Sequence, residues 1–443
     1  MFCAIKLSKS DPTPLYIQLA NELARLIKSG AIPSKTKLPT IRTLSSKLKI
    51  NRDTVVSAYK LLETQGLVVA HVGSGTYVAP NILTSTSEST LEPNISCSTV
   101  GFSKELFPVN ICKDLIANIL DTEGWSAFSD PLYRERNLIR QSINHFLESV
   151  GISSSPAGLR LISDMYSFLV DLLKISSKTA ICVEEYRDLT YTSFIRSLGF
   201  KVYEIPLHQG GMDLDILEKH LKTSSISYIW ISSYIQNPTG ICYSEENKQA
   251  LLKLAEKYDC YIIEDGTFSD FTYDNHTLLP LYNSYGYDRV VFLYHFSRLY
   301  LPHLTYSFVA LPSALIKKVP DHLACTLGER VIHYYLESDA FWDIRQQIIS
   351  SSYEKYNKVL TSLLAYSNYF DIYCTQGGLF FWIKPLDISL SELCTIFIEN
   401  NIIISPGDLF STLNSIDYFR LSISSLSFEQ IDKLIATLAY ISQ

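Results

Sequence analysis

The sequence predicts a multidomain protein: an N-terminal winged helix-turn-helix, then a larger α/β domain that ends in a small α+β lobe. Three observations support this fold class. The chain has 443 residues, 47% of them apolar, which is more than a single domain needs. Residues 11–79 contain three helical stripes followed by two short strand patterns. From about residue 160, strand and helix signals alternate, which indicates a mostly parallel sheet covered by helices.

Composition argues against several classes of protein. No run of about 18 apolar residues occurs, so no membrane span is predicted. Residues 1–10 carry two lysines but no long apolar core, so we do not expect a signal peptide. The nine cysteines include no CxxC pair. This favours reduced thiols in a cytoplasmic protein over a disulfide framework or a zinc site.

The net charge of −7 hides an asymmetry between the two ends of the chain. Residues 1–80 contain 11 Lys and Arg against 4 Asp and Glu, which gives +7. The remaining residues contain 27 basic and 41 acidic side chains, which gives −14. A basic head on an acidic body predicts that only the head meets a polyanion, although chance clustering on a solvated surface would give the same charge.

The N-terminal module, residues 1–79, begins with a helix over Leu15–Ser29, whose apolar residues recur at helical spacing. Gly30 ends this helix, Pro39 begins a second one, and Asn51 can cap a third. The later helices are predicted over Thr40–Leu48 and Arg52–Gln65, and two strands over Leu67–Ala70 and Thr76–Ala79. This order of elements makes a winged helix.

Four segments of this module carry a more specific pattern. They are residues 37–42 (KLPTIR), 50–55 (INRDTV), 58–67 (AYxxLxxxGL) and 73–78 (GSGTYV). Their order closely resembles the GntR family of bacterial repressors over the whole module, and the resemblance implies binding to double-stranded DNA. The module departs from the family pattern at Lys49, where glycine is usual, and at Ser34-Lys35, which replace a Pro-Gly turn.

The candidate DNA-binding residues lie on the second and third helices and on the wing. They are Lys37, Arg42, Arg52, Thr54, Gly73, Ser74 and Gly75. Arg52 and Thr54 begin the third helix, the end that enters the major groove, and arginine suits bidentate contact with guanine. The wing glycines let backbone N–H groups approach the DNA backbone, and Lys35, Lys37 and Lys49 add attraction to phosphate. The alternative is a winged helix used for protein contacts.

Residues 80–100 are predicted to be a flexible linker. The segment is rich in Ser and Thr and has no helical or strand period of its own. A chain of about twenty such residues reaches some tens of ångströms. A tether of this length would let the head lie over a different subunit.

The body, residues 101–443, divides into a large lobe over about 125–320 and a small lobe over about 321–443. Strands are predicted over Lys178–Glu184, Lys201–Leu207, Ile226–Ser233, Cys260–Glu264, Val290–Tyr294 and Ser307–Leu311. Helices between them include Tyr191–Leu198, Leu214–Leu221 and Ser244–Tyr258. In the small lobe, a long helical region, His322–Ser367, precedes short strands around Gly378–Ile383 and a final helix, Ser427–Tyr440.

Several motifs of the body occur in a fixed order. They are residues 130–131 (DP), 236–240 (QNPTG), 262–265 (IIED), 289–302 (RVVFLYHFSRLYLP), 405–410 (SPGDLF) and 419–422 (FRLS). The set resembles the aminotransferase-like fold of fold-type-I enzymes, whose cofactor is pyridoxal phosphate (PLP). Together with the head it is similar to the MocR subfamily of GntR regulators, which join a GntR head to an aminotransferase-like body. The resemblance covers essentially the whole chain.

The resemblance assigns four residues to the cofactor or ligand. Asp265 matches the partner of the pyridine nitrogen, Asn237 the donor to the phenolic oxygen, and Arg420 the arginine that binds a carboxylate. Arg298 stands where the family has its Schiff-base lysine, and a guanidinium stays protonated and cannot be that nucleophile. The residues alone also allow a strand-end cap for Asp265, a turn role for Asn237 and a surface ion pair for Arg420.

Other positions of the pocket depart from the family pattern as well. Thr305 replaces an arginine, Asp188 replaces a tyrosine, and Gly266-Thr267 replace an aspartate-tyrosine pair. Asp164 lies where a glycine-rich phosphate turn is expected, and its carboxylate would repel phosphate. Because these changes occur together, we predict that no catalytic residue remains and that no covalent PLP aldimine forms.

His295 and His303 flank Arg298 and would allow a metal pair, but isolated histidines near a pocket are more often hydrogen-bonded core residues, so no metal site is predicted. We therefore predict a homodimeric, DNA-binding transcriptional regulator. Its body would sense a small carboxylate or amino-acid-like effector, with PLP absent or held without a covalent bond. Two alternatives remain open: a working PLP-dependent aminotransferase with a DNA-binding head, and a regulator whose body is only a dimer scaffold.

Overall fold

The computed structural model of the 443-residue chain describes residues 14–28, 36–48, 50–64, 67–71, 75–78, 95–102, 106–129, 133–273, 280–283, 288–301, 304–321, 326–373, 377–412 and 416–442. The chain divides into two compact units, Met1–Glu92 and Pro93–Gln443. In the parts of the chain that the structure describes, no helix is long and apolar enough to cross a membrane.

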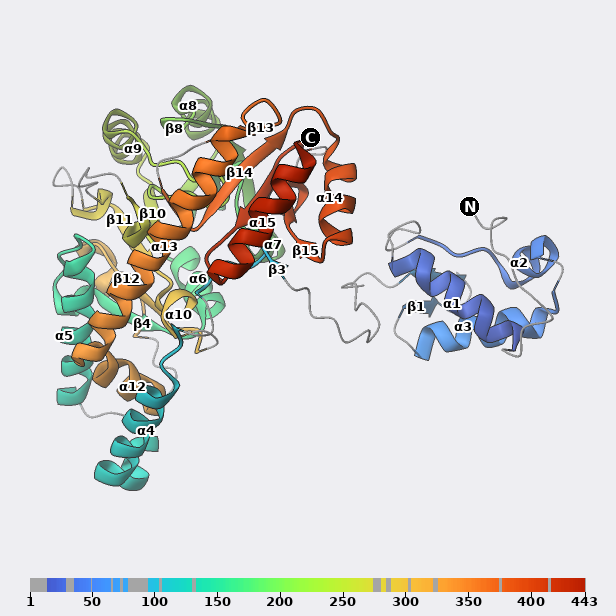
Figure 1. The fold of residues 1–443 in the computed structure, drawn as a ribbon. Helices are drawn as coiled ribbons and strands as arrows, with labels where there is room; N and C mark the ends of the chain where they lie inside the picture. The colour runs from blue at the N-terminus through green and yellow to red at the C-terminus, as the bar shows by residue number, and fades with distance from the viewer. Residues whose placement is uncertain are drawn as a thin grey trace. The chain divides into compact units, whose positions relative to one another are not determined.

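The first unit consists of three helices and a β-hairpin (Figure 1). Its elements are α1 (Leu15–Lys28), α2 (Ile41–Leu48), α3 (Arg52–Thr64), β1 (Val68–His71) and β2 (Gly75–Val78). Leu19, Leu23, Leu44, Val55 and Leu62 are fully buried and form its core. β1 and β2 pair as antiparallel strands. These elements confirm the predicted winged helix.

A seven-stranded sheet forms the centre of the second unit, in the order β4-β12-β11-β10-β9-β5-β6. The strands are β4 (Leu159–Ile162), β5 (Ala180–Glu184), β6 (Lys201–Ile205), β9 (Ile226–Ile231), β10 (Tyr261–Asp265), β11 (Val290–Tyr294) and β12 (Ser307–Ala310). β12 is antiparallel to both of its neighbours, and the other neighbouring pairs are parallel. Every residue of β5, β11 and β12 is buried, as expected of strands covered on both faces.

Helices cover both faces of this sheet. Successive residues of a strand point to opposite faces. Thus Ile229 of β9 packs in the cluster that contains α8 (Leu214–Thr223) and α9 (Glu245–Lys257). Its neighbour Tyr228 packs in the cluster that contains α6 (Met165–Lys174) and α7 (Leu189–Ser197). A third cluster joins Phe146 and Tyr335, from α5 (Tyr133–Ser149) and α12 (Thr326–Leu336), to β11 and β12.

The small lobe has a four-stranded sheet, in the order β13-β14-β17-β16. Its elements are α13 (Asp339–Ala365), β13 (Phe370–Ile372), β14 (Phe380–Pro385), α14 (Leu390–Glu399), β15 (Ile402–Ile403), β16 (Ser405–Pro406), β17 (Phe419–Ser422) and α15 (Phe428–Ile441). Side chains from all three helices and from β13, β14 and β17 share one buried apolar cluster. Figure 1 shows α13 and α15 running side by side over this sheet.

The second unit has further described elements outside these two sheets and their main helices. They are β3 (Ile95–Ser96), α4 (Val109–Glu123), η3 (Gly124–Phe128), η4 (Pro156–Gly158), β7 (Leu207–His208), β8 (Gly211–Met212), η5 (Ser269–Phe271), η6 (Leu281–Asn283), α10 (Phe296–Leu299), α11 (Ser313–Ile316) and η7 (Gly407–Leu409). The parallel strands β5, β9, β10 and β11 all end at one edge of the sheet, and the loops that follow them form the pocket described below.

Three predictions need correction. Residues 95–100 are not linker: β3 pairs in parallel with β15 of the small lobe, because the apolar Ile95 and Cys97 join its core. Residues 80–94 lie outside the described part. The helical region predicted over 322–367 is two helices, α12 and α13, and Ser338 caps the second by accepting the N–H of Phe341 at 3.3 Å. The sheet also contains β4, which was not predicted.

Candidate functional site

Two of the predicted DNA-binding arginines lie on the surface of the first unit. Arg42 on α2 and Arg52 at the first position of α3 are exposed, and Thr54 is half-buried. Asn51 accepts the N–H of Asp53 at 3.3 Å, so it caps α3 as predicted. Tyr59 of α3 donates to the carbonyl of Pro39 at 2.7 Å, which fixes α3 against the start of α2.

Both strands of the wing belong to the described residues, but the turn over residues 72–74 does not. Gly75 has φ +118°, and a Cβ there would lie 2.8 Å from Cε of Lys37, so only glycine fits this backbone. Lys37 is exposed, and its ammonium lies 5.6 Å from the centre of the Tyr77 ring. The other predicted contacts of the wing and turns, Gly73, Ser74, Lys35 and Lys49, lie outside the described residues.

The pocket of the second unit lies where β5, β9, β10 and β11 end. Its inner part is a cavity of about 70 Å³. It is lined by Val183, Glu184, Arg187, Asp188, Tyr191, Thr192, Trp230, Ser232, Asn237, Asp265, Phe268, His295 and Arg298. A wider hollow of about 420 Å³ shares Asp188, Tyr191, His295 and Arg298 with it and also contains Asp164 and Thr305. The structure thus brings Asn237, Asp265 and Arg298 together, as predicted, with Arg420 one contact away.

Asp265 closes a turn after β10 and also lies at the wall of the cavity. Its Oδ1 accepts the N–H and the hydroxyl of Thr267, at 3.0 and 2.5 Å, and so closes the turn after β10. Its Oδ2 lies 3.9 Å from Nε2 of His295 at the wall of the cavity. His295 in turn contacts Ser307 through Nδ1 at 2.8 Å, and burial lowers its pKa. Asp265 therefore caps its own strand and still presents charge to the pocket.

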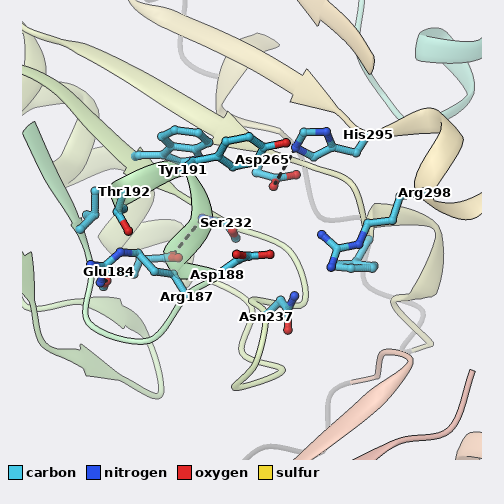
Figure 2. Close-up of a pocket in the computed structure, with 13 residues that line it drawn as sticks. Glu184, Arg187, Asp188, Tyr191, Thr192, Ser232, Asn237, Asp265, His295 and Arg298 are labelled. Carbon is cyan, nitrogen blue, oxygen red and sulfur yellow. Dashed lines mark hydrogen bonds and ion pairs between the residues drawn. The ribbon is translucent and has the colours of Figure 1, made fainter. Parts of the chain in front are cut away.

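Arg298 projects its guanidinium into the pocket (Figure 2). The group lies over the ring of Phe268, 5.9 Å from its centre. Among the described residues it has no side-chain hydrogen bond or ion pair. Figure 2 shows it pointing towards Asp188, the residue that replaces the expected tyrosine. Arg298 is therefore a cation available to an anionic group in this pocket.

Arg420 is buried and already bonded to the protein. It is 5% exposed and stacks 4.6 Å from the centre of the Phe410 ring. Its Nη1 donates to Oδ1 of Asn237 at 2.7 Å, and its Nη2 donates to the carbonyl of Ser98 at 2.5 Å. Burial, followed by repulsion from Arg298, lowers the pKa of Arg420 to about 9. The surface ion pair considered for Arg420 is therefore wrong, because the side chain is not at the surface.

Two aspartates cap helices at the mouth of the pocket. Asp164 accepts the N–H groups of Tyr166 and Ser167, at 3.0 and 3.3 Å, and the hydroxyl of Ser167 at 2.5 Å. Asp188 accepts the N–H of Thr190 at 2.9 Å. Burial opposes ionisation of Asp188, but the bonds from Thr190 and the charge of Arg298 outweigh it and lower its pKa. Both carboxylates therefore have local structural partners.

The structure also gives a reason for one further departure. A Cβ at Gly266 would lie 2.4 Å from the ring of Phe292, so packing in the core requires glycine there. Thr305 has φ +58°, in the left-handed region, and its side chain is exposed at the rim of the wider hollow. The family pattern has an arginine at the position of Thr305, and neither Gly266 nor Thr305 carries a positive charge.

Sequence reasoning missed Glu184, Arg187, Tyr191 and Trp230. The carboxylate of Glu184 accepts the N–H of Ser232 at 2.9 Å and the hydroxyl of Tyr243 at 2.7 Å, and burial raises its pKa to about 7. A signal did exist, because Glu184 ends a buried strand at the edge where ligands bind. The aromatic residues gave no such signal, since aromatic side chains in predicted helices and strands are ordinarily core.

The residues present do not fit a covalently held PLP. By the family resemblance, Arg298 stands at the position of the aldimine lysine. A helix N-terminus binds phosphate through its N–H groups, and at α6 two of those groups are already bonded to Asp164. Asp265 and Asn237 are suitably placed for a pyridine ring, but they supply no nucleophile.

The histidines considered for a metal do not form a cluster in the described residues. Within those residues, no group of three or more His, Cys, Asp or Glu side chains could hold a metal ion. His295 is occupied by Ser307 and faces Asp265, and His303 lies outside the described part of the chain.

Two family models match the chain. One, described as bacterial regulatory proteins of the gntR family, matches residues 15–78. The other, aminotransferase class I and II, matches residues 165–438, which is more than half of the chain. Proteins with the second fold generally depend on PLP.

Curated relatives share this arrangement. The HTH-type transcriptional regulator YdfD of Bacillus subtilis (strain 168) is 22% identical over 466 residues, which cover 96% of this chain and 95% of YdfD. The probable rhizopine catabolism regulatory protein MocR of Rhizobium meliloti is 22% identical over 337 residues, 70% of this chain and 68% of MocR.

Solved structures show the fold of the body. An archaeal alanine:glyoxylate aminotransferase superimposes with a TM-score of 0.68 at 22% identity, over 79% of this chain and 90% of the enzyme. LysN, the α-aminoadipate aminotransferase of Thermus thermophilus, does so with a TM-score of 0.67 at 22% identity, over 79% and 93%. Both are similar to the second unit in architecture.

Proposed function

The chain belongs to the MocR subfamily of GntR-type transcriptional regulators, with a body of the aminotransferase class I and II family, and we propose that this body senses a small anionic ligand without holding PLP covalently. The observation that carries the proposal is Arg298, a permanent cation that projects into the pocket from the position of the aldimine lysine. The wing and helix α3 would bind the operator.

Recognition of a carboxylate follows from the chemistry around Arg298. A guanidinium offers paired N–H donors that match the two oxygens of a carboxylate, and such a charge-assisted pair is stronger than a neutral hydrogen bond. Arg298 has no competing acid partner among the described residues, although the charge of Asp188 acts on it. An effector with both a carboxylate and an amine would satisfy the two charges, which supports an amino-acid-like ligand as one form of this anion.

For the head, we propose that Arg52 and Thr54 read bases while Arg42, Lys37 and the wing around Gly75 contact phosphates. Arg52 is exposed at the first position of α3, the end that winged helices place in the major groove. Exposed arginine and lysine on α2 and the wing supply the salt-dependent part of the affinity. Gly73 and Ser74 belong to this proposal through the family pattern alone.

We also propose that the body forms a homodimer. Large apolar side chains are exposed on α4 and η3, where Val109 is 62%, Trp125 81% and Phe128 61% exposed. A monomer in water gains free energy by covering such a patch. Sedimentation equilibrium of the full chain, with Trp125→Ser as the variant, tests this: we expect a dimer for the natural chain and a weakened dimer for the variant.

An active aminotransferase is the second candidate, and one arrangement favours it. Asp265 faces the cavity and Asn237 is bonded to Arg420, a geometry that would suit a pyridine ring and a carboxylate. That candidate needs an amine nucleophile, and Arg298 cannot serve as one.

Trapping with borohydride separates the two candidates. The full chain is mixed with PLP and reduced with borohydride, and the protein is digested and mapped by mass spectrometry. The proposal predicts no reduced adduct at any residue that lines the pocket. A stoichiometric adduct in the pocket would overturn it in favour of the enzyme.

A further inference from the structure

We propose that two of the chain's own side chains occupy the places of the cofactor: the carboxylate of Asp164 takes the position of its phosphate, and the phenol of Tyr191 takes that of its ring. This inference rests on the proposed loss of covalent PLP and adds which residues keep the cofactor out. It predicts that their removal reopens the site to a phosphorylated pyridine.

Asp164 lies at the N-terminus of α6. The first amides of a helix have no partner within the helix and attract an anion. Here the Asp164 carboxylate accepts the N–H groups of Tyr166 and Ser167 and the hydroxyl of Ser167. A phosphate would need the same donors and would be repelled by the carboxylate charge. The anion site of this helix is therefore filled from within the chain.

Tyr191 lines the same cavity as Asp265, the predicted partner of the pyridine nitrogen. Tyr191 stacks on His295, with ring centres 6.0 Å apart and planes within 5°. It also stacks on Trp230, at 5.8 Å and 21°, and its ring centre lies 5.7 Å from that of Tyr166. Burial raises the pKa of the Tyr191 phenol, and the charge of Asp265 raises it further. Figure 2 shows the phenol lying beside Asp265 along one wall of the pocket.

Tyr191 lines the inner cavity, whereas Asp164 lines only the wider hollow. A flat ring beside Asp265 would have to lie where the Tyr191 phenol lies, and the space that remains is about 70 Å³. Removing the phenol adds space next to the carboxylate, and removing Asp164 exposes the amides at α6. Neither substitution changes Arg298, so binding and covalent capture can be tested apart.

The test uses full-length Asp164→Gly, Tyr191→Ala and the double variant. The probe is pyridoxine 5′-phosphate, which has no aldehyde and so cannot react with surface lysines. Asp213→Gly, which removes the cap of α8, and Tyr334→Ala, an exposed tyrosine of α12, are the matched controls. Isothermal titration should show at least tenfold tighter binding to the double variant than to the natural chain and to the controls. Adding Arg298→Lys to the double variant should then give a borohydride-reducible adduct with PLP.

The failures are distinguishable. If the double variant keeps the circular dichroism spectrum and melting temperature of its controls but binds pyridoxine 5′-phosphate no better than the natural chain, the inference is wrong and the proposed function stands. A reducible PLP adduct in the pocket of the natural chain would instead sink the proposed function itself.

A second and independent inference concerns residues 95–101, which we name the latch segment. The geometry points to this segment as the physical connection between the pocket and the linker of the head. Its hydrogen bonds to the small lobe include Ile95 N–H to Asn401 carbonyl at 3.2 Å, Cys97 N–H to Ile403 carbonyl at 2.7 Å and Ser422 N–H to Cys97 carbonyl at 2.9 Å. The Ser405 hydroxyl donates to the Ser98 carbonyl at 3.2 Å, the Ser422 hydroxyl to the Thr99 carbonyl at 2.6 Å, and the Gly101 N–H to the Ser424 hydroxyl at 3.1 Å.

One side chain joins the latch segment to the pocket. Arg420 donates to the Ser98 carbonyl and to Asn237, and Asn237 lines the cavity. A carboxylate that reached Arg420 would compete with the neutral Ser98 carbonyl, because hydrogen bonds to a charged acceptor are stronger. Loss of the Ser98 bond would loosen the latch segment, from which the chain continues to the head.

Hydrogen exchange tests the latch in the full-length protein. Arg420→Gln should raise exchange of peptides covering residues 95–101 at least tenfold and change affinity for a promoter fragment of the chain's own gene at least threefold. Thr412→Val removes another contact between the lobes, to Glu204, and should do neither. If Arg420→Gln is folded and leaves exchange at the latch unchanged, or loosens it without changing DNA affinity, the inference is overturned.

Discussion

The recognition surface of the head and the pocket of the body differ in how their residues are brought together. In the head, the cap Asn51 and the exposed Arg52 are neighbours in sequence, and both lie at the start of α3. In the pocket, Ser98, Asn237 and Arg420 meet through a single guanidinium although more than 300 residues separate the first from the last. A local pattern therefore describes the first surface, whereas the second depends on the whole fold.

The two regions also differ in the chemistry of their side chains. The head keeps the positive side chains that DNA binding needs and exposes them to solvent. In the pocket, Asp265, Asn237 and Arg298 line one cavity, and Asp164 accepts N–H groups at the start of α6. Substitutions in the head are therefore expected to change its affinity for DNA. Substitutions in the pocket are expected to change the burial of charged groups and the stability of the second unit.

The largest expected effect belongs to Glu184, the buried acid at the wall of the pocket. Burial raises its pKa from 4.5 to about 7, so the folded state disfavours its ionised form. Its contribution to stability is therefore fully present below pH 4.5 and is lost as the pH rises to about 7, a change of about 3 kcal/mol. Glu184→Gln should remove this loss, so the variant gains stability relative to the natural chain between pH 5 and pH 8.

Urea unfolding of the body at several pH values measures this difference. Glu246→Gln on the exposed face of α9 is the control and should show no comparable dependence. If the stability difference between the Glu184→Gln variant and the natural chain were the same at pH 5 and pH 8, burial would not be controlling this carboxyl.

The next largest effect is expected in the head. Arg52→Ala should weaken binding to a promoter fragment by roughly 1–3 kcal/mol and relax the preference at one base position, because a bidentate contact to guanine is lost. Lys60→Ala, near the other end of α3, should change affinity much less. Fluorescence anisotropy at fixed salt measures both. Equal effects of the two variants would contradict the proposed docking of α3.

Much of the fold could be predicted from sequence because its signals are local. The winged helix follows from caps, glycines and apolar spacing, and the parallel strands from continuous apolar runs. Those signals also located Asp265 and Arg298 at strand ends. They could not show that Tyr191 stacks on His295, because periodicity assigns a face of a helix but not its partner on another element. The Ser and Thr content of residues 80–100 likewise hid the short strand at Ile95.

Each region has a helix whose N-terminus is capped by a side chain, so the effect of removing a cap on stability can be compared between them. Asn51→Ala in the head and Asp164→Ala in the body each remove the acceptor of helix N–H groups, which costs about 1 kcal/mol. Asn51→Ala should destabilise only the first unit, as a lower melting temperature of that unit. Asp164→Ala should destabilise the second unit but also remove a charge from the pocket mouth.

Added inorganic phosphate separates these two consequences. It should restore part of the melting temperature of Asp164→Ala, because the amides at α6 can then donate to an external anion. It should do nothing for Asn51→Ala beyond its effect on the natural chain. Identical responses of both variants would mean that α6 has no special affinity for an anion.

The smallest effect is expected for Lys37→Ala, which tests whether Lys37 contributes to DNA binding through its charge alone. Its ammonium is exposed over the Tyr77 ring and is proposed to contact a phosphate. Lys37→Ala should weaken DNA binding about equally for all sequences and reduce the slope of log affinity against log salt by about 1, because one fewer counterion is released. Lys219→Ala, an exposed lysine of the body, should leave the slope unchanged. A loss of sequence preference with an unchanged slope would instead assign Lys37 to base reading, and the division between positioning and reading residues in the head would have to be redrawn.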